Sequence, residues 1–223
     1  MKYAATFAFA FLCFVSLSFA RQFEGVIEMQ MKDANQDSPT PMKYMVKGDL
    51  VRMEMQSPRG EMAMIMNLKE RKTIMLMPQM NSYMERTMDS AVQRPADAKK
   101  SELTKTGKTE KILGYDCEQY IIKGEKRETE IWAAKGLGTC TRHPMGGGRG
   151  RMGGGGQMPE GWEDEIRSKG FFPLRTMTKN AEGKEESRME VTKIEKKDLD
   201  ASLFKAPEGW QKMDMPMMGR PRN

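Results

Sequence analysis

Residues that commonly carry catalysis are scarce in this sequence of 223 residues. It contains a single histidine, His143, beside Pro144 at the edge of a glycine-rich stretch. It has no Ser or Cys nucleophile motif, and no Gly-rich phosphate loop follows an expected strand. A lone histidine in a loop is more often solvated than catalytic. We therefore expect no enzyme activity, no catalytic residues and no cofactor.

Apolar runs long enough to cross a membrane are also missing. The apolar stretch 4–14 follows Lys2 and is too short for a comfortable membrane span. Ser18-Phe19-Ala20 then has the small-x-small pattern of a cleavage site. We expect a signal peptide over residues 1–20 and a periplasmic or secreted mature chain without a transmembrane segment.

A strong charge of one sign is absent as well. The formal net charge is only +6, and Lys and Arg alternate with Glu along most expected strands, which is typical of a solvated outer face. We expect no nucleic-acid partner, and export from the cytoplasm further disfavours one. The mild positive charge is compatible with loose contact with an anionic membrane surface. We expect the protein to be a monomer.

Cysteine is too rare for a disulfide-rich scaffold. Three cysteines are present, and Cys13 lies within the expected signal peptide. The remaining pair, Cys117 and Cys140, would form a disulfide by default in an oxidising compartment. Closing a loop of this size would contribute about 3 kcal/mol in the loop-entropy model. Two separate thiols are the alternative, and we expect the bridge.

Alternation with a period of two runs through most of the chain. Such alternation with turn residues between the segments predicts antiparallel strands. We expect a mainly-β domain over residues 21–212, a single strongly curved antiparallel sheet with one or two short covering helices. A helix is predicted over 159–169, a flexible Gly-rich insertion over 145–158 and a disordered tail over 213–223. Strands are predicted over 23–32, 42–47, 50–56, 61–68, 72–77, 83–88, 103–106, 111–122, 129–133, 174–179 and 184–194.

Methionine is abundant, with 24 residues, many of them two positions apart. This spacing places side chains on one face of a strand. Unbranched thioethers repack readily around varied apolar partners, which suits a lining for lipid or another hydrophobic ligand. An ordinary core in which Met replaces Leu is about equally supported. The candidate ligand-binding residues are Ile27, Met29, Met31, Met53, Met55, Met62, Met64 and Met66.

A third interpretation of the methionines is a site for Cu(I) or Ag(I), because thioethers are soft ligands. A flexible tail can gather several of them around one ion, whereas methionines on strands are committed to a packed face. If such an ion binds, we expect the tail residues to hold most of it, namely Met213, Met215, Met217 and Met218.

Several short motifs, taken in order, resemble a known family. They are Phe23-Glu24-Gly25, Lys47-Gly48-Asp49-Leu50-Val51-Arg52-Met53-Glu54, Ile112-Leu113-Gly114-Tyr115-Asp116-Cys117-Glu118-Gln119-Tyr120, Glu130-Ile131-Trp132 and Leu203-Phe204-Lys205-Ala206-Pro207-Glu208-Gly209-Trp210. This set resembles the family called domain of unknown function 4412, exported bacterial proteins that look related to the periplasmic lipoprotein carrier LolA. The resemblance implies a half-barrel whose concave apolar face is covered by helices and, in the carriers, holds acyl chains.

Overall fold

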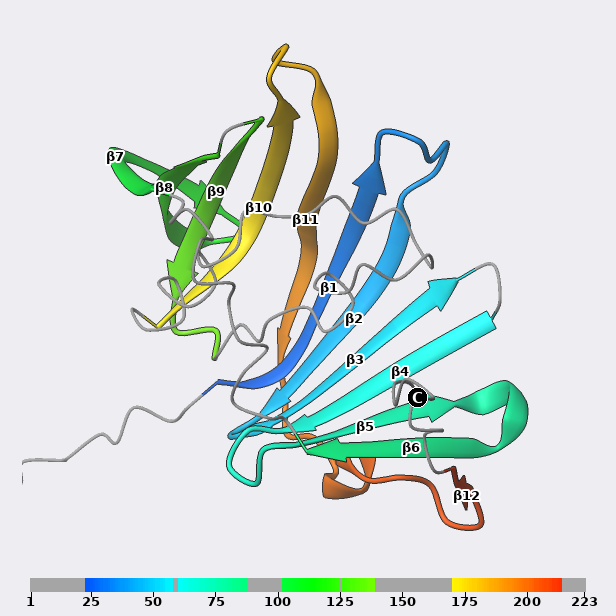
Figure 1. Cartoon of the computed structure of the whole chain (residues 1–223). Helices are drawn as coiled ribbons and strands as arrows, with labels where there is room; N and C mark the ends of the chain where they lie inside the picture. Colours follow the sequence, from blue (N-terminus) through cyan, green and yellow to red (C-terminus); the bar gives the residue numbers. More distant parts are fainter. Residues whose placement is uncertain (1–22, 58–59, 88–101, 125, 139–169, 214–223) are drawn as a thin grey trace, which may run out of the picture.

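The computed structural model describes residues 23–57, 60–87, 102–124, 126–138 and 170–213. Within these ranges the chain forms one sheet of twelve strands (Figure 1). The strands are β1 (Glu24–Asp33), β2 (Thr40–Lys47), β3 (Leu50–Ser57), β4 (Gly60–Asn67), β5 (Lys72–Met77), β6 (Ser82–Thr87), β7 (Glu102–Ile112), β8 (Tyr115–Lys123), β9 (Arg127–Lys135), β10 (Phe171–Asn180), β11 (Glu185–Lys196) and β12 (Gln211–Lys212).

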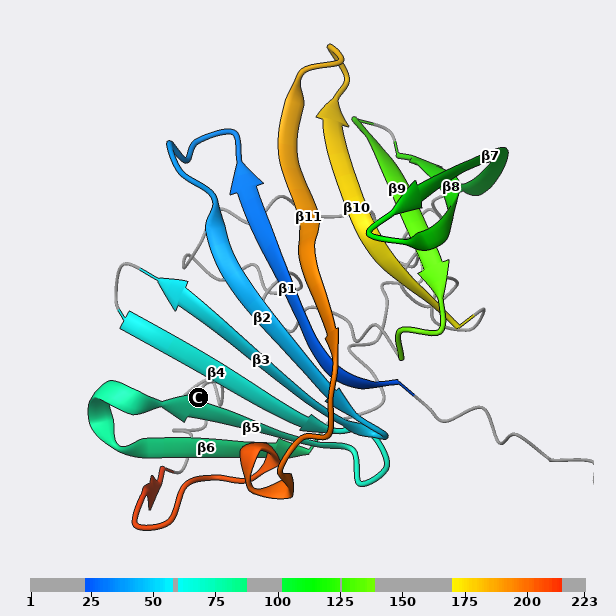
Figure 2. The same ribbon diagram turned by 180° about the vertical axis from the view of Figure 1, so that it is seen from behind.

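The sheet consists of two antiparallel meanders joined side by side. Strands β1 to β6 form one meander and β7 to β11 the other, and β1 pairs antiparallel with β11 between them. The short strand β12 pairs in parallel with β6 and forms one edge of the sheet, while β7 forms the other. Figure 2 shows the strands fanning progressively from β1 to β6. The prediction of one mainly-β, curved antiparallel sheet is confirmed.

One predicted strand was wrong. The segment 111–122 was expected to be continuous, but it contains a hairpin turn between β7 and β8, in which Ile112 pairs with Tyr115. Leu113 and Gly114, between them, both adopt positive φ, 49° and 84°. Positive φ at both central residues is the geometry of a two-residue hairpin turn. Alternation alone did not reveal this turn, because Leu113 continues the apolar pattern.

Among the described residues the only helical segments are two 3₁₀ turns, η1 (Pro78–Met80) and η2 (Ala201–Phe204). No helix in this part of the chain is long and apolar enough to cross a membrane. The expected signal peptide, the Gly-rich insertion and the helix predicted over 159–169 lie outside the described residues. Met213, expected to begin a disordered tail, donates its backbone N–H to the Tyr83 carbonyl oxygen at 2.8 Å, and residues 214–223 are outside the described ranges.

The sheet buries apolar side chains on both faces. On one face, the segment after β11 packs Leu199 and Phe204 against Val26, Met45 and Ile65. Two hydrogen bonds fix this segment: the Arg52 Nη1 group donates to the Leu203 carbonyl oxygen at 2.9 Å, and the Leu199 N–H donates to Glu24 Oε1 at 2.7 Å. The segment after β11 therefore covers this face of the sheet.

Candidate functional site: a methionine face

The second face of the sheet carries most of the strand methionines, and we call it the methionine face. Met29 of β1 pairs with Met42 of β2, Met42 with Met55 of β3, and Met55 with Met62 of β4. Residues directly opposite each other in antiparallel strands have their side chains on the same face. Four adjacent strands therefore present one continuous row of thioethers.

A second row runs parallel to the first, two residues along the strands. Tyr44 pairs with Met53, Met53 with Met64, Met64 with Met75, and Met75 with Met84. This row starts on β2 and ends on β6. The two rows together cover the methionine face from β1 to β6, and sequence spacing alone does not give this lateral alignment.

The methionine face is the inner side of the curl. The Tyr44 ring of β2 meets the Phe172 ring of β10 edge to face at 5.4 Å, although β1 and β11 lie between these strands. At the far end, Arg175 of β10 donates two hydrogen bonds to the Glu110 carboxylate of β7 at 3.0 and 3.1 Å, across β8 and β9. Side chains from strands that are not adjacent meet in this way when a sheet curves toward them.

Small residues lie under this ion pair. Glu110 pairs with Cys117, and Cys117 with Ala134 of β9, so these residues share the face, and both Cys117 and Ala134 are buried. The hydrogen bonds that Arg175 donates to Glu110 hold the pKa of the Arg175 guanidinium above its ordinary value, so this guanidinium stays charged at all physiological pH values. The pair links β10 to β7 at this end of the sheet.

Burial on the methionine face falls from its centre to its rim. Ile27, Met29, Met53, Met64 and Met66 are buried in one apolar cluster. Met31, Met55 and Met75 are half-buried and pack against that cluster. Met62 and Met84 are half-buried outside it. The centre therefore behaves as packed core, and the rim offers accessible thioethers.

The structure places all eight predicted ligand-binding residues on this face. Seven of them belong to or pack against one cluster, and Met62 lies beside them through its pairing with Met55. Sequence analysis missed Met42, Met75 and Met189, which pack in the same cluster. Met75 was visible from its spacing with Met77. Neither Met42 nor Met189 has another methionine two positions away, so only strand register reveals them.

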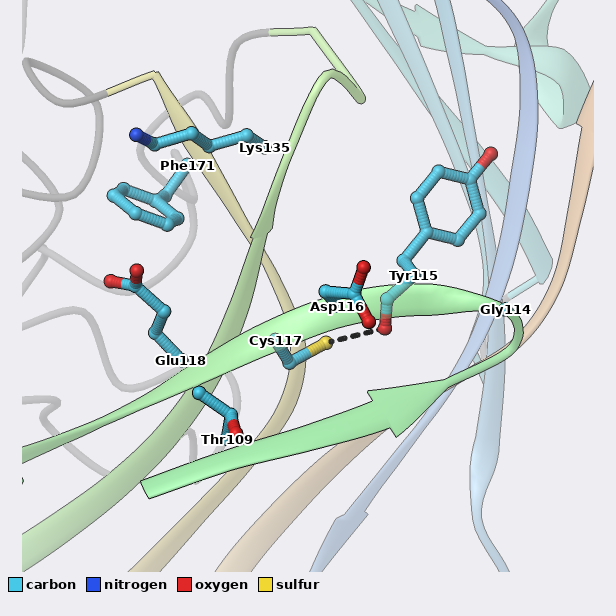
Figure 3. A pocket seen from close by; sticks show the side chains of 8 residues that line it. All are labelled: Thr109, Gly114, Tyr115, Asp116, Cys117, Glu118, Lys135 and Phe171. Atoms are coloured by element: carbon cyan, nitrogen blue, oxygen red, sulfur yellow. Dashed lines mark hydrogen bonds between the residues drawn. The ribbon is translucent and has the colours of Figure 1, made fainter. Parts of the chain in front are cut away.

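A separate open depression lies at the β8–β9 side of the sheet, with a volume of about 450 Å³ (Figure 3). Tyr115, Cys117, Glu118, Lys135 and Phe171 are among the residues that line it. The Lys135 ammonium lies 5.0 Å from the Phe171 ring centre. A hydrogen bond from Lys105 is the main cause that lowers the pKa of Glu118. These charged groups are already paired, so they are poorly placed to orient a ligand in the depression.

Cys117 has a free thiol in the structure, and its sulfur donates a hydrogen bond to the Tyr115 carbonyl oxygen at 3.6 Å. Burial raises the pKa of this thiol, which makes it a poor nucleophile. Cys140 lies outside the described residues. The structure therefore does not show the expected disulfide, and the bridge stays a prediction.

Other predicted groups also lie outside the described residues: His143, Met215, Met217 and Met218. In the part of the chain that is described, no group of three or more His, Cys, Asp or Glu side chains could hold a metal ion. That search concerns hard and intermediate ligands, so it leaves thioether chemistry open.

One curved antiparallel sheet with apolar residues on its inner face defines the class of this protein. The chain belongs to the family described as Domain of unknown function (DUF4412), whose model matches residues 23–210. The family expected from the ordered motifs is thus confirmed. No curated protein matches the sequence.

Comparison with solved structures gives matches at low sequence identity. The chain is similar to an uncharacterized conserved protein from Thermus thermophilus, with a TM-score of 0.53 and 11% identity over 87% of this chain and 91% of that one. It is more weakly similar to MucB in the MucA/MucB complex of Pseudomonas aeruginosa, with a TM-score of 0.48 and 12% identity over 88% and 60% of the two chains. For a putative outer membrane lipoprotein-sorting protein domain from Vibrio parahaemolyticus the TM-score is 0.34, with 10% identity over 84% and 90%.

Proposed function

We propose that this chain is a non-enzymatic, exported binding protein or carrier that holds lipid or another hydrophobic ligand against the methionine face. The observation that carries the proposal is the pair of aligned methionine rows across β1 to β6, on the inner side of the sheet. An ordinary core needs apolar volume but has no need of one flexible residue type at so many adjacent positions. Flexible thioethers suit a surface that repacks around varied ligands.

The half-buried rim is the part of this face that a ligand would contact. Met55 and Met62 face each other across β3 and β4 and are both half-buried. Each methylene buried against them contributes about 0.8 kcal/mol. Micromolar binding requires about 8 kcal/mol, so a single acyl chain has enough apolar surface for it.

Ligand identity is tested on protein purified from its native compartment. Native mass spectrometry should detect a bound species of higher mass, and solvent extraction should recover lipid from it. The purified protein should also bind a fluorescent fatty acid. If the protein is purified without bound lipid and does not bind the fatty acid, the methionine face is only a packed core.

A matched set of variants tests whether the ligand binds at the rim of the methionine face. Met55→Gln and Met62→Gln should each weaken fatty-acid binding about fivefold, because replacing a thioether contact by an amide costs roughly 1 kcal/mol. Glu61→Gln is the control, since Glu61 neighbours Met62 in sequence, is exposed and points to the opposite face. Equal loss of binding in all three variants, or no loss in any, would contradict a ligand held on this rim.

A further inference from the structure

The second methionine row continues past the meander into the C-terminal segment. Strand β12 lies beside β6, with Gln211 paired with Ser82 and Lys212 with Tyr83 (Figure 1). The next position along this register places Met213 beside Met84. The hydrogen bond from the Met213 N–H to the Tyr83 carbonyl oxygen, 2.8 Å, extends the pairing to that residue.

Strand alternation also assigns Met213 to the methionine face. The Lys212 ammonium bonds to the Glu85 carboxylate at 2.9 Å, and Glu85 pairs with Ile74, which packs in the cluster on the opposite face. Lys212 therefore points to the opposite face, and its neighbour Met213 points to the methionine face. Met84 is on the same face, opposite Met75.

These thioethers are not committed to the core. Neither Met84 nor Met213 belongs to any of the three apolar clusters among the described residues, and Met75 only packs at the margin of one. Met213 is 36% exposed, and the other two are half-buried. All three side chains are therefore partly accessible from solvent, and they lie on β5, on β6 and at the end of β12.

We propose that Met75, Met84 and Met213 form a soft-metal site that binds one Cu(I) or Ag(I) ion at this edge of the sheet. Neighbouring strands are about 4.8 Å apart, so three unbranched side chains in one row can converge on a single ion. Thioether ligands select soft monovalent cations. The ligands are neutral, and the carboxylate of Glu85 lies on the opposite face, so it is not available there to divalent oxygen-seeking cations.

This site shares only Met213 with the tail site expected from the sequence, and it does not depend on lipid binding. Its strength is preorganisation: backbone pairing fixes two ligands on β5 and β6 and holds the third beside them. A free tail must lose conformational entropy to gather the same number of sulfur atoms.

Competition titration of the mature protein with Ag(I) tests the site. The parent protein should bind one ion. Met84→Leu and Met213→Leu should each weaken that binding roughly tenfold or more, because mutating a residue that only hydrogen-bonds to a metal ligand already lowers metal affinity about tenfold. Leucine preserves the apolar volume, so folding should be unaffected. Met45→Leu is the matched control, because Met45 is buried on the opposite face. A chain that ends at Met213 should bind as the parent does.

Peroxide footprinting gives an independent measurement. Ag(I) should protect Met84 and Met213 from oxidation, while Met80, 59% exposed in η1, should remain reactive as an internal reference. The proposal is overturned if Met84→Leu and Met213→Leu bind Ag(I) like the parent. It is also overturned if removing residues 214–223 abolishes binding, because that result would assign the ion to the tail. If circular dichroism shows that the leucine variants are unfolded, footprinting of the parent decides: equal protection of Met80 and Met84 by Ag(I) then overturns the proposal.

Discussion

Leu113 occupies a backbone position that disfavours leucine. Its φ is 49°, and Gly114 follows at 84°, so both residues of the turn are left-handed. The left-handed conformation costs a non-glycine residue about 1–2 kcal/mol, because Cβ approaches the following carbonyl oxygen. The side chain is 47% exposed, so little packing offsets this cost. Leu113 therefore stores strain at the tip of the β7–β8 hairpin.

Replacing Leu113 by Asn should stabilise the protein. Asn adopts the left-handed conformation readily and precedes Gly in the favoured two-residue hairpin turn. We expect a gain of about 1 kcal/mol, which raises the melting temperature by about 2–4 °C in a chain of this size. Leu113→Ala is the control, since alanine removes the exposed side chain but keeps the strain. A melting temperature that rises equally for both variants would assign the effect to exposure instead.

At the scale of elements, β12 is attached to the sheet through its contacts with β6. Its two residues pair with β6, the Met213 N–H bonds to Tyr83, and the Lys212 ammonium bonds to the Glu85 carboxylate at 2.9 Å. The hydrogen bond from Lys212 is the largest cause that lowers the pKa of Glu85 below its ordinary value of 4.5. Charge on Glu85 therefore helps to hold β12 at the edge of the sheet.

Acidification should loosen β12. The folded-state pKa of Glu85 is lowered. The stabilisation of β12 by the charged Glu85 carboxylate is therefore fully present above the unfolded-state pKa, and it is lost as the pH falls through the lowered value. The protection of the Met213 amide against hydrogen exchange should therefore fall as the pH drops from about 5 to about 3, relative to amides in β3. In Lys212→Gln this additional fall should disappear. Protection of Met213 that is independent of pH in the parent would show that backbone pairing alone holds β12.

At the scale of the whole molecule, the β1–β11 pairing joins the two meanders. At this junction Gly25 lies so close to β11 that a Cβ atom added to it would be 2.2 Å from the Glu195 carbonyl oxygen. No side chain fits at that distance unless the strands separate. The cluster on the methionine face extends across the junction, with members on β1 to β4 and on β7 to β11. A substitution at Gly25 should therefore destabilise both meanders.

Gly25→Ala should lower the free energy of unfolding by about 1–3 kcal/mol, the usual cost of overpacking. Gly124→Ala is the matched control: a Cβ atom there would lie 3.4 Å from the Arg127 carbonyl oxygen, an ordinary contact, and no positive φ is involved. Denaturant titration measures both. Hydrogen exchange of β3 and of β9 should be accelerated together in Gly25→Ala. Acceleration limited to one meander would mean that the halves unfold independently.

The strands were predictable from the sequence where the alternation of apolar and polar residues determines them. Nine of the eleven predicted strands coincide closely with strands of the sheet, because one-sided burial imposes a period of two on the residues themselves. The β7–β8 turn escaped because a leucine stands where Asn or Asp usually signals a left-handed residue. Strand β12 escaped because two residues carry no periodicity, and only the adjacent β6 makes them a strand.

The sequence by itself determined the class of fold, the family and the faces of individual strands, since alternation and turn residues are local properties of the chain. It placed Met53 and Met55 on one face, and likewise Met62, Met64 and Met66. Only the tertiary structure decided that these faces adjoin, that Met42 and Met75 complete the rows, and that Met213 lies next to Met84. Strand order and register decide which side chains become neighbours, and they depend on pairings such as β1 with β11, whose partners lie far apart in the sequence.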